Sequence, residues 1–114
     1  MEPEAVIKAL GALAQEHRLA VFRLLVQAGP DGMPAGLIAE AIGVAPSSMS
    51  FHLAQLANAG LVIQRRQSRS IIYSANFGAM NGLMGYLTEN CCGGVSCSPA
   101  AACPPQTCEE RDVA

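Results

Sequence analysis

The chain has 114 residues, the usual length of a single domain with one hydrophobic core. Hydrophobic residues make up 51% of the sequence and aromatic residues only 4%, so its apolar content is mainly aliphatic and favours helices. No run of about 18 apolar residues occurs, which argues against a membrane span, and the first residues lack the basic start of a secretory signal, so we expect a cytoplasmic protein. The net charge of −2 by itself argues against a generally basic nucleic-acid-binding protein.

Charge and cysteine are both unevenly distributed along the chain. Residues 1–90 hold six basic and six acidic residues, with three of the basic ones inside positions 65–69, whereas residues 91–114 supply the whole net charge of −2. All five cysteines lie in the last quarter, at Cys91, Cys92, Cys97, Cys103 and Cys108. An odd number of cysteines without a secretory signal favours metal binding or redox chemistry over a disulfide framework.

Apolar residues at helical spacing predict two helices near the start of the chain, over residues 3–15 and 17–28. The residues expected to face the core are Val6, Ile7, Leu10, Leu13 and Ala14 in the first helix and Leu19, Phe22, Leu25 and Val26 in the second. Glycine and proline at positions 29–32 end the second helix. A short third helix is predicted over residues 34–42 and is ended by Gly43.

A fourth helix is predicted to begin at Pro46 and to end at residues 58–60. Its expected core residues are Phe51, Leu53, Leu56 and Ala57, with Met49 as a further candidate. Two β-branched segments, 61–66 and 69–75, are separated by Gln67 and Ser68 and predict a hairpin. Residues 77–90 return to helical spacing, and the residues beyond 92 show no periodicity.

This order of elements predicts a mainly α fold, a winged helix-turn-helix with a two-stranded β-wing. The short third helix, the turn after it and the fourth helix form the helix-turn-helix, and the hairpin forms the wing. We expect residues 1–92 to make up the DNA-binding and dimerisation domain. Residues 93–114 are expected to be a flexible, cysteine-rich tail.

The polar residues left on the outer side of the fourth helix are candidates for contacting DNA: Ser47, Ser48, Ser50, His52 and Gln55. Hydroxyl groups at a helix N-terminus can donate to phosphate beside the free backbone N–H groups. A glutamine can read adenine with two hydrogen bonds, and a histidine can donate to a phosphate or a guanine edge. The alternative is that Ser47 caps the helix, the other serines are solvated and His52 is an ordinary surface residue.

Arg65, Arg66 and Arg69 surround the predicted wing turn, where at least two of them can project toward the DNA backbone or minor groove. Such a trio can also be an ordinary solvated surface. Directly after a helix-turn-helix it favours phosphate contact, which would make binding strongly dependent on salt. A basic wing of this kind can act on an acidic protein.

Residues 48–73 begin with Ser-Met-Ser-Phe-His-Leu and continue into a basic hairpin ending in Tyr73, and they resemble the ArsR/SmtB family of winged-helix metalloregulatory repressors, as does the segment 16–25. The resemblance covers residues 5–90 and implies a homodimeric repressor that binds operator DNA and is released by an inducer. Family members often have glycine at the wing turn, where this chain has Gln67 and Ser68. Two half-sites one helical turn apart also require a two-fold axis, although the last helix could instead cover only its own core.

The same resemblance indicates where an inducer would bind. The third helix has no cysteine, and the last helix has no histidine and only Glu89, so the two other sites of the family cannot form. Cys91, Cys92 and Cys97 resemble the C-terminal site of arsenic-responsive members. Soft thiolates select thiophilic ions, and trivalent arsenic, As(III), takes three sulfur ligands, so As(III) is the expected inducer, with Sb(III) and methylated arsenic as relatives.

Other interpretations of the cysteines stay open. Cys103 and Cys108 could supply a spare ligand or a two-thiolate site for methylated arsenic, or be incidental solvated thiols. Zinc, cadmium or a redox role is also compatible, although the spacing lacks the Cys-x₂-Cys pair of structural zinc sites. The main alternative function is a thiol redox sensor on the same DNA-binding dimer, in which Cys91 or Cys92 pairs with Cys97. The sequence does not favour an enzyme, because no basic group lies near Cys91, Cys92 or Cys97 in the sequence.

Overall fold

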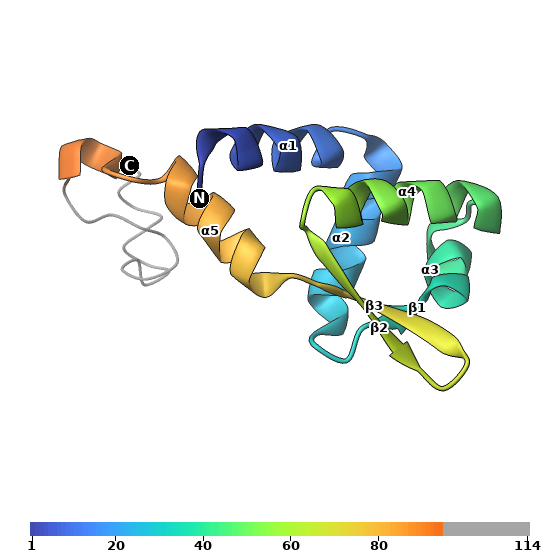
Figure 1. Cartoon of the computed structure of the whole chain (residues 1–114). Coiled ribbons are helices and arrows are strands. Elements are labelled where there is room, and N and C mark those ends of the chain that lie inside the picture. The colour runs from blue at the N-terminus through green and yellow to red at the C-terminus, as the bar shows by residue number, and fades with distance from the viewer. Residues whose placement is uncertain (95–114) are drawn as a thin grey trace, which may run out of the picture. The chain divides into compact units, whose positions relative to one another are not determined.

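The computed structural model describes residues 1–94 (Figure 1). Within this range the elements in chain order are α1 Pro3–Leu13, α2 Glu16–Ala28, β1 Met33–Pro34, α3 Ala35–Ile42, α4 Pro46–Asn58, β2 Val62–Gln67, β3 Ser70–Ala75, α5 Phe77–Leu87 and the 3₁₀ helix η1 Cys91–Gly94. The chain divides into a compact unit Met1–Leu83 and a second unit that starts at Met84. The predicted fold class, a mainly α winged helix-turn-helix, is confirmed.

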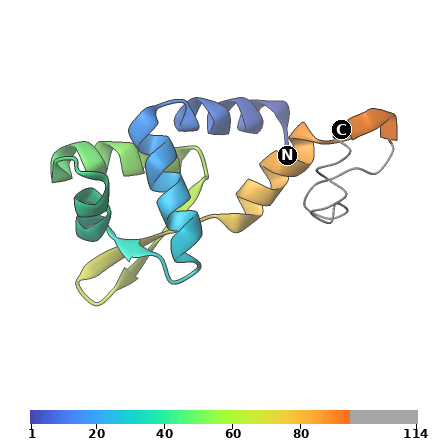
Figure 2. The same cartoon turned by 180° about the vertical axis from the view of Figure 1, so that it is seen from behind.

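The core of the first unit is aliphatic. Its largest fully buried side chains come from α2, α3, α4 and the start of the hairpin: Val21, Leu25, Ile38, Met49, Leu53, Leu56 and Leu61. α2 descends from the end of α1 to the loop that leads into β1 (Figure 2) and contacts α1, α3 and α4. The helix-turn-helix is therefore anchored by α2.

Five of the residues predicted to face the core are exposed in the structure. Ile7 is 69% exposed and Phe51 is 56% exposed, and Leu10, Ala14 and Leu19 are exposed as well. α1 buries Val6 and Ala9, and α2 buries Val21 beside Phe22 and Leu25. The prediction counted every apolar residue near the helical stripe, but each helix offers only a narrow face to this small core.

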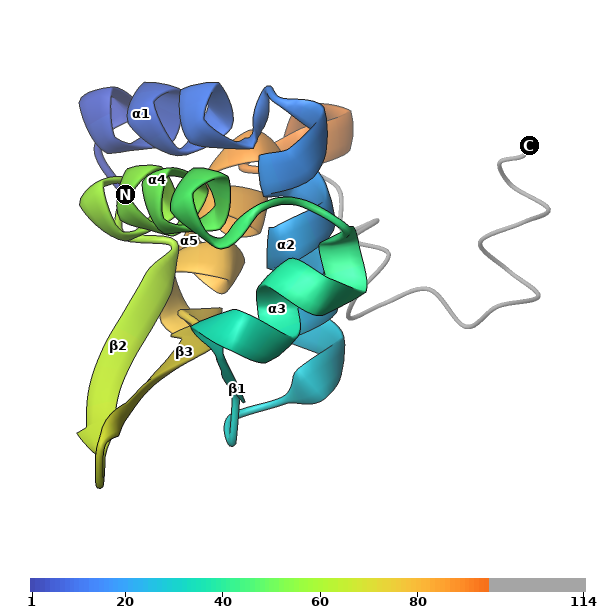
Figure 3. The same ribbon diagram turned by 90° about the vertical axis from the view of Figure 1, so that its right-hand side faces the viewer.

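The hairpin is part of a three-stranded antiparallel sheet with the order β1-β3-β2. The sequence predicted only two strands. β1 was missed because it has two residues, Met33 paired with Tyr73 and Pro34 paired with Ile72, which is too short for an alternating pattern. Figure 3 shows β2 and β3 extending away from the helices of the first unit. The sheet thus joins the wing to the chain just before α3.

The wing turn lies one residue later than predicted. Gln67 pairs with Ser70, so Ser68 and Arg69 form the turn instead of Gln67 and Ser68. Ser68 has φ +57°, the left-handed conformation that glycine adopts most easily. Ser68 therefore takes the place of the glycine that is common at this turn.

The last predicted helix is shorter in the structure. α5 ends at Leu87 instead of residue 90, and Asn90 has φ +57°, which breaks the helical path before η1. The 3₁₀ helix η1 was not predicted, and it contains Cys91 and Cys92. Of the expected tail 93–114, only Gly93 and Gly94 belong to the described residues.

In the part of the chain that the structure describes, no single helix has both the length and the hydropathy to cross a membrane. α3 and α4 meet these criteria only when taken together, and that pair is bent by 108°.

Candidate nucleic-acid interface

α3 and α4 have the geometry of a helix-turn-helix. The two helices are bent by 108° across the three residues 43–45, within the usual range for this motif. Gly43 makes the sharp turn possible with φ +83°, and its backbone N–H donates to the Ala39 carbonyl at 2.8 Å. Because of this bend α3 does not run alongside α4, and it leaves the outer face of α4 uncovered.

The first turn of α4 presents unsatisfied backbone donors. Its N-cap residue is Ala45, which offers no side-chain hydrogen bond, and Pro46 occupies the first turn. Ser47, Ser48 and Ser50 are all exposed, and their hydroxyl groups make no hydrogen bond to residues 1–94. Ser47 therefore does not cap the helix, and the alternative structural role considered for it is wrong. An anion that met this turn would find both hydroxyl and backbone donors.

The buried side of α4 fixes the orientation of its outer face. Met49, Leu53 and Leu56 are almost completely buried. Phe51 stands two residues from both Met49 and Leu53, about 200° around the helix, so it points away from the core. Gln55 follows Phe51 by one turn and is half-buried. The structure thus places an aromatic ring on the surface that was expected to be entirely polar.

His52 lies at the boundary between α4 and α2 and is half-buried. Its ring is 5.5 Å from the His17 ring and meets the Phe51 ring edge-on at 5.9 Å, measured between centroids. Its Nδ1 atom is buried and has no hydrogen-bond partner within residues 1–94. Burial, then the positive charge of Arg18, then His17, lower the pKa of His52 below its ordinary 6.5. At neutral pH His52 is therefore an uncharged group beside the outer face.

Arg18 is fixed beside this histidine pair by the start of α2. Its Nε donates to the Ala12 carbonyl at 2.7 Å, and its backbone N–H donates to the capping Gln15 side chain at 2.9 Å. A guanidinium held in one place keeps its charge near His52, which explains its contribution to the lowered pKa.

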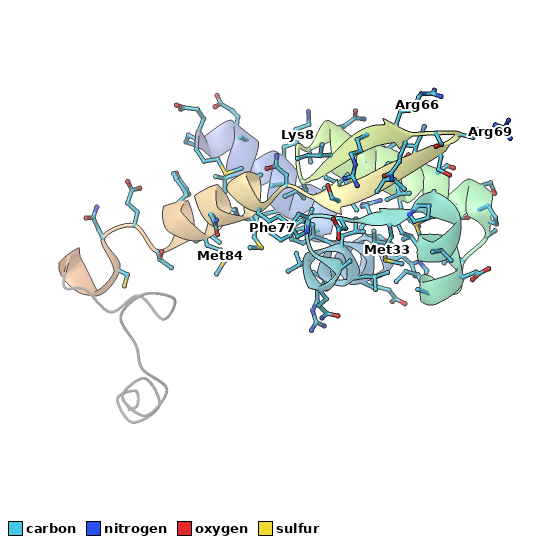
Figure 4. The ribbon with its side chains drawn as sticks, turned by 90° about the horizontal axis from the view of Figure 1, so that it is seen from below. Lys8, Met33, Arg66, Arg69, Phe77 and Met84 are labelled. Atoms are coloured by element: carbon cyan, nitrogen blue, oxygen red, sulfur yellow. The ribbon has the colours of Figure 1, made fainter. Side chains whose placement is uncertain are left out.

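The three wing arginines differ in their contacts. Arg65 donates to the carbonyl of Asp31 at 3.0 Å and, at 3.4 Å each, to the carbonyl of Pro30 and the side chain of Gln67. Arg66 and Arg69 are exposed and form no hydrogen bond or ion pair within the described chain. Figure 4 shows both of them reaching outward from the end of the wing. These two arginines are available to phosphate, whereas Arg65 braces the wing against the loop before β1.

The cysteines stand apart from this surface in the sequence. Cys91 is half-buried in η1, and its backbone N–H donates to the Thr88 carbonyl at 3.0 Å. Cys92 is the next residue of η1. Cys97, Cys103 and Cys108 lie outside the described residues. Within the described range there is no group of three metal-binding side chains, so the structure gives the position of one predicted ligand and the backbone of a second.

Two parts of the interface were missed by sequence reasoning. The carbonyls that hold Arg65 are 34 and 35 residues earlier in the chain, and no local pattern connects them to the wing. Phe51 was assigned to the core because it is apolar, although its distance from Met49 and Leu53 places it on the opposite side of α4. The helical phase could have corrected that assignment.

Comparison with known proteins gives consistent matches. The helix-turn-helix domain family matches residues 13–65. The HTH-type transcriptional regulator YgaV of Escherichia coli (strain K12) is 30% identical over 83 residues, which are 73% of this chain and 82% of YgaV. Two further curated relatives are 32% and 44% identical, and the aligned regions span only 63% and 55% of their lengths.

Two solved structures share the fold. An ArsR-like transcriptional regulator from Rhodococcus sp. RHA1 aligns with a TM-score of 0.66 at 25% identity, covering 74% of this chain and 76% of that one. The homodimeric winged helix-turn-helix DNA-binding domain of Mb0332 from Mycobacterium bovis, a possible ArsR-family transcriptional regulator, aligns with a TM-score of 0.61 at 26% identity, covering 76% and 81%.

Proposed function

Because this chain belongs to the ArsR family of DNA-binding transcriptional regulators, we propose that it is a homodimeric repressor that leaves its operator when As(III) binds its C-terminal thiolates. The observation that carries the DNA-binding part is the outer face of α4. Exposed Ser47, Ser48 and Ser50 surround a helix start with free N–H donors, and Arg66 and Arg69 extend from the neighbouring wing.

A dimer is part of the proposal for two reasons. One recognition helix makes few base contacts, and two copies related by a two-fold axis would read two half-sites about one helical turn apart. α1 also leaves Ile7 and Leu10 exposed, and the second unit leaves Met84 and Leu87 exposed. Apolar side chains of this kind are stabilised when a second copy covers them. The homodimeric domain of Mb0332 supports this arrangement.

The proposed inducer site consists of Cys91, Cys92 and Cys97. The backbone turns at Asn90 with φ +57° and at Gly93 with φ +67°, on either side of the two adjacent cysteines. Such turns let the chain fold back so that a third thiolate, from Cys97, can approach the pair. The donor set is soft and contains no carboxylate or imidazole, which suits As(III), with Sb(III) and methylated arsenic as chemical relatives.

The proposed effect of the inducer is a change in the dimer. Ligand binding at the three thiolates would reshape the segment directly after α5 and favour a dimer whose two α4 helices fit DNA poorly. A coupling free energy of ~1–3 kcal/mol would weaken operator binding about 5–150-fold.

The test uses duplex DNA that the wild-type protein selects from a random pool. Fluorescence anisotropy with the full reduced chain should show binding without arsenite and an affinity about 5–150-fold weaker with it. Cys92→Ser should bind the same DNA and ignore arsenite, while Cys108→Ser serves as a matched thiol control that still responds.

Three other results would contradict parts of the proposal. Wild type that stays bound in arsenite excludes the inducer. Release by peroxide but not by arsenite supports the thiol redox sensor instead. A failure to select any duplex sequence contradicts operator binding itself.

A further inference from the structure

Phe51 is the one aromatic side chain on the outer face of α4 in the described chain. It is 56% exposed, and it does not belong to the buried core. Its ring meets that of His52 edge-on at 5.9 Å between centroids. A phenyl ring held mostly in water gains free energy from any partner that covers it, at about 25 cal/mol per Å² of apolar area. The core gives no reason for an aromatic residue at this position.

The neighbours of Phe51 belong to the candidate DNA interface. Residues three and four positions apart lie side by side on a helix, so Ser47 and Ser48 precede Phe51 on its face and Gln55 follows it. Phe51 is the sixth residue of α4, in the N-terminal half of a recognition helix that meets base edges. Any duplex that contacts these polar side chains would also cover the ring.

The major groove offers one strongly apolar feature, the C5-methyl group of thymine, and phenylalanine is among the side chains that contact it. The faces of the other bases are hidden by stacking, and their major-groove edges carry polar atoms. Gln55, one turn after Phe51, can hydrogen-bond adenine. Phe51 and Gln55 together therefore favour an A·T-containing step over a G·C one.

We propose that Phe51 is a specificity-determining residue that packs against a thymine methyl group in each half-site of the operator. This proposal rests on the DNA-binding part of the proposed function, and it is independent of the inducer. The charges are compatible, since α4 carries no acidic residue and the only carboxylate on the preceding helix α3 is Glu40.

The first measurement compares the DNA that each protein selects from a random duplex pool. Wild type should select a fixed thymine at one symmetrical position in each half-site. Phe51→Ala should lose that preference and keep the others. Leu37→Ala is the matched control, because Leu37 is an exposed apolar residue of α3 (51%), and it should keep the wild-type preference.

The second measurement replaces the selected thymine by deoxyuridine, which removes only the methyl group. Wild-type affinity should fall about fourfold for each methyl group removed and about fifteenfold when both half-sites are changed. Phe51→Ala should bind the two duplexes equally. Thermal unfolding should give the same midpoint for Phe51→Ala and wild type, since the ring is outside the core.

The outcomes separate this inference from the proposed function. Wild type that selects no duplex contradicts DNA binding itself. If wild type selects DNA and Phe51→Ala selects the same thymine with the same deoxyuridine penalty, the role of Phe51 is overturned. A variant with unchanged DNA preference that loses binding to another protein would assign the ring to a protein partner and also overturn the inference.

Discussion

At the scale of single residues, the wing arginines divide into two kinds. Arg66 is exposed and bonds to no described residue, whereas Arg65 is held by the carbonyls of Pro30 and Asp31. Only a guanidinium that reaches a phosphate releases counterions from DNA. A variant of Arg66 can therefore test phosphate contact, and the same substitution at Arg65 serves as its control.

Arg66→Gln should lower the slope of log affinity against log salt by about 0.9 for each phosphate that the variant no longer neutralises. Arg65→Gln should leave the slope nearly unchanged, because its charge is already directed at the protein. Anisotropy titrations over a range of salt concentrations measure both slopes. Equal decreases in the two variants would contradict this division.

His52 makes a prediction about pH. Its pKa is lowered in the folded state, first by burial and then by Arg18 and His17. As the pH falls below about 6.5, the unfolded chain takes up a proton at this position while the folded chain does not, so folding stability falls. Above that pH His52 contributes no pH dependence.

Urea unfolding of wild type and His52→Gln at pH 7.5 and pH 5.5, at one fixed protein concentration, measures this effect. Wild type should lose more stability between the two pH values than His52→Gln does. All other residues are the same in the two proteins, so the difference between their losses reports on His52. The same decrease in both proteins would show that His52 is not responsible.

At the scale of elements, Asn76 connects three of them. Its Oδ1 accepts from the Ala79 backbone N–H at 3.1 Å at the start of α5, and its Nδ2 donates to the Gly60 carbonyl at 2.9 Å at the end of α4. Its own backbone N–H donates to the Leu61 carbonyl at 2.8 Å, beside the start of β2. One side chain therefore caps a helix and fixes the base of the hairpin.

Asn76→Ala should lower the free energy of unfolding by about 1–2 kcal/mol, the usual cost of removing a helix cap. Asn76→Asp keeps the capping oxygen and adds a favourable negative charge at the start of α5, but it places an acceptor opposite the Gly60 carbonyl. If the cap is the larger contribution, this variant should lie between the alanine variant and wild type. Chemical unfolding gives all three values. An aspartate variant as unstable as the alanine variant would assign the main role to the Gly60 hydrogen bond.

The elements also show what local sequence can predict. The ends of α2, α3 and α4 were close to the prediction, because Gly29, Gly43 and Gly60 adopt positive φ angles just beyond them. β1 has too few residues for a pattern, and it exists because β3 offers it an edge to pair with. Similarly, the hydrogen bonds of Arg65 depend on the fold bringing residues 30 and 31 beside the wing.

At the scale of the whole molecule, the net charge of −2 proved a poor guide to DNA binding. What matters is the position of a few charges, with Arg66 and Arg69 at the wing end. The motif predicts a set of candidate DNA-contacting residues, but it does not predict the exposure of Phe51 or the bracing role of Arg65, because both depend on packing. The ligand set of Cys91, Cys92 and Cys97 stays a prediction from the sequence, because Cys97 lies outside the described residues.

The hydrogen bonds of Arg65 have a consequence for the spacing of the DNA contacts within one half-site of an operator. They tie the middle of β2 to the loop before β1, the strand that leads directly into α3, and so restrain the wing relative to the helix-turn-helix within one protomer. In a complex with DNA, the number of base pairs between the bases that α4 contacts and the phosphates that the wing contacts would then be set by one protomer. The distance between the two half-sites would depend on the dimer instead. An inducer that alters the dimer would therefore change that distance and leave the sequence preference of each half-site unchanged.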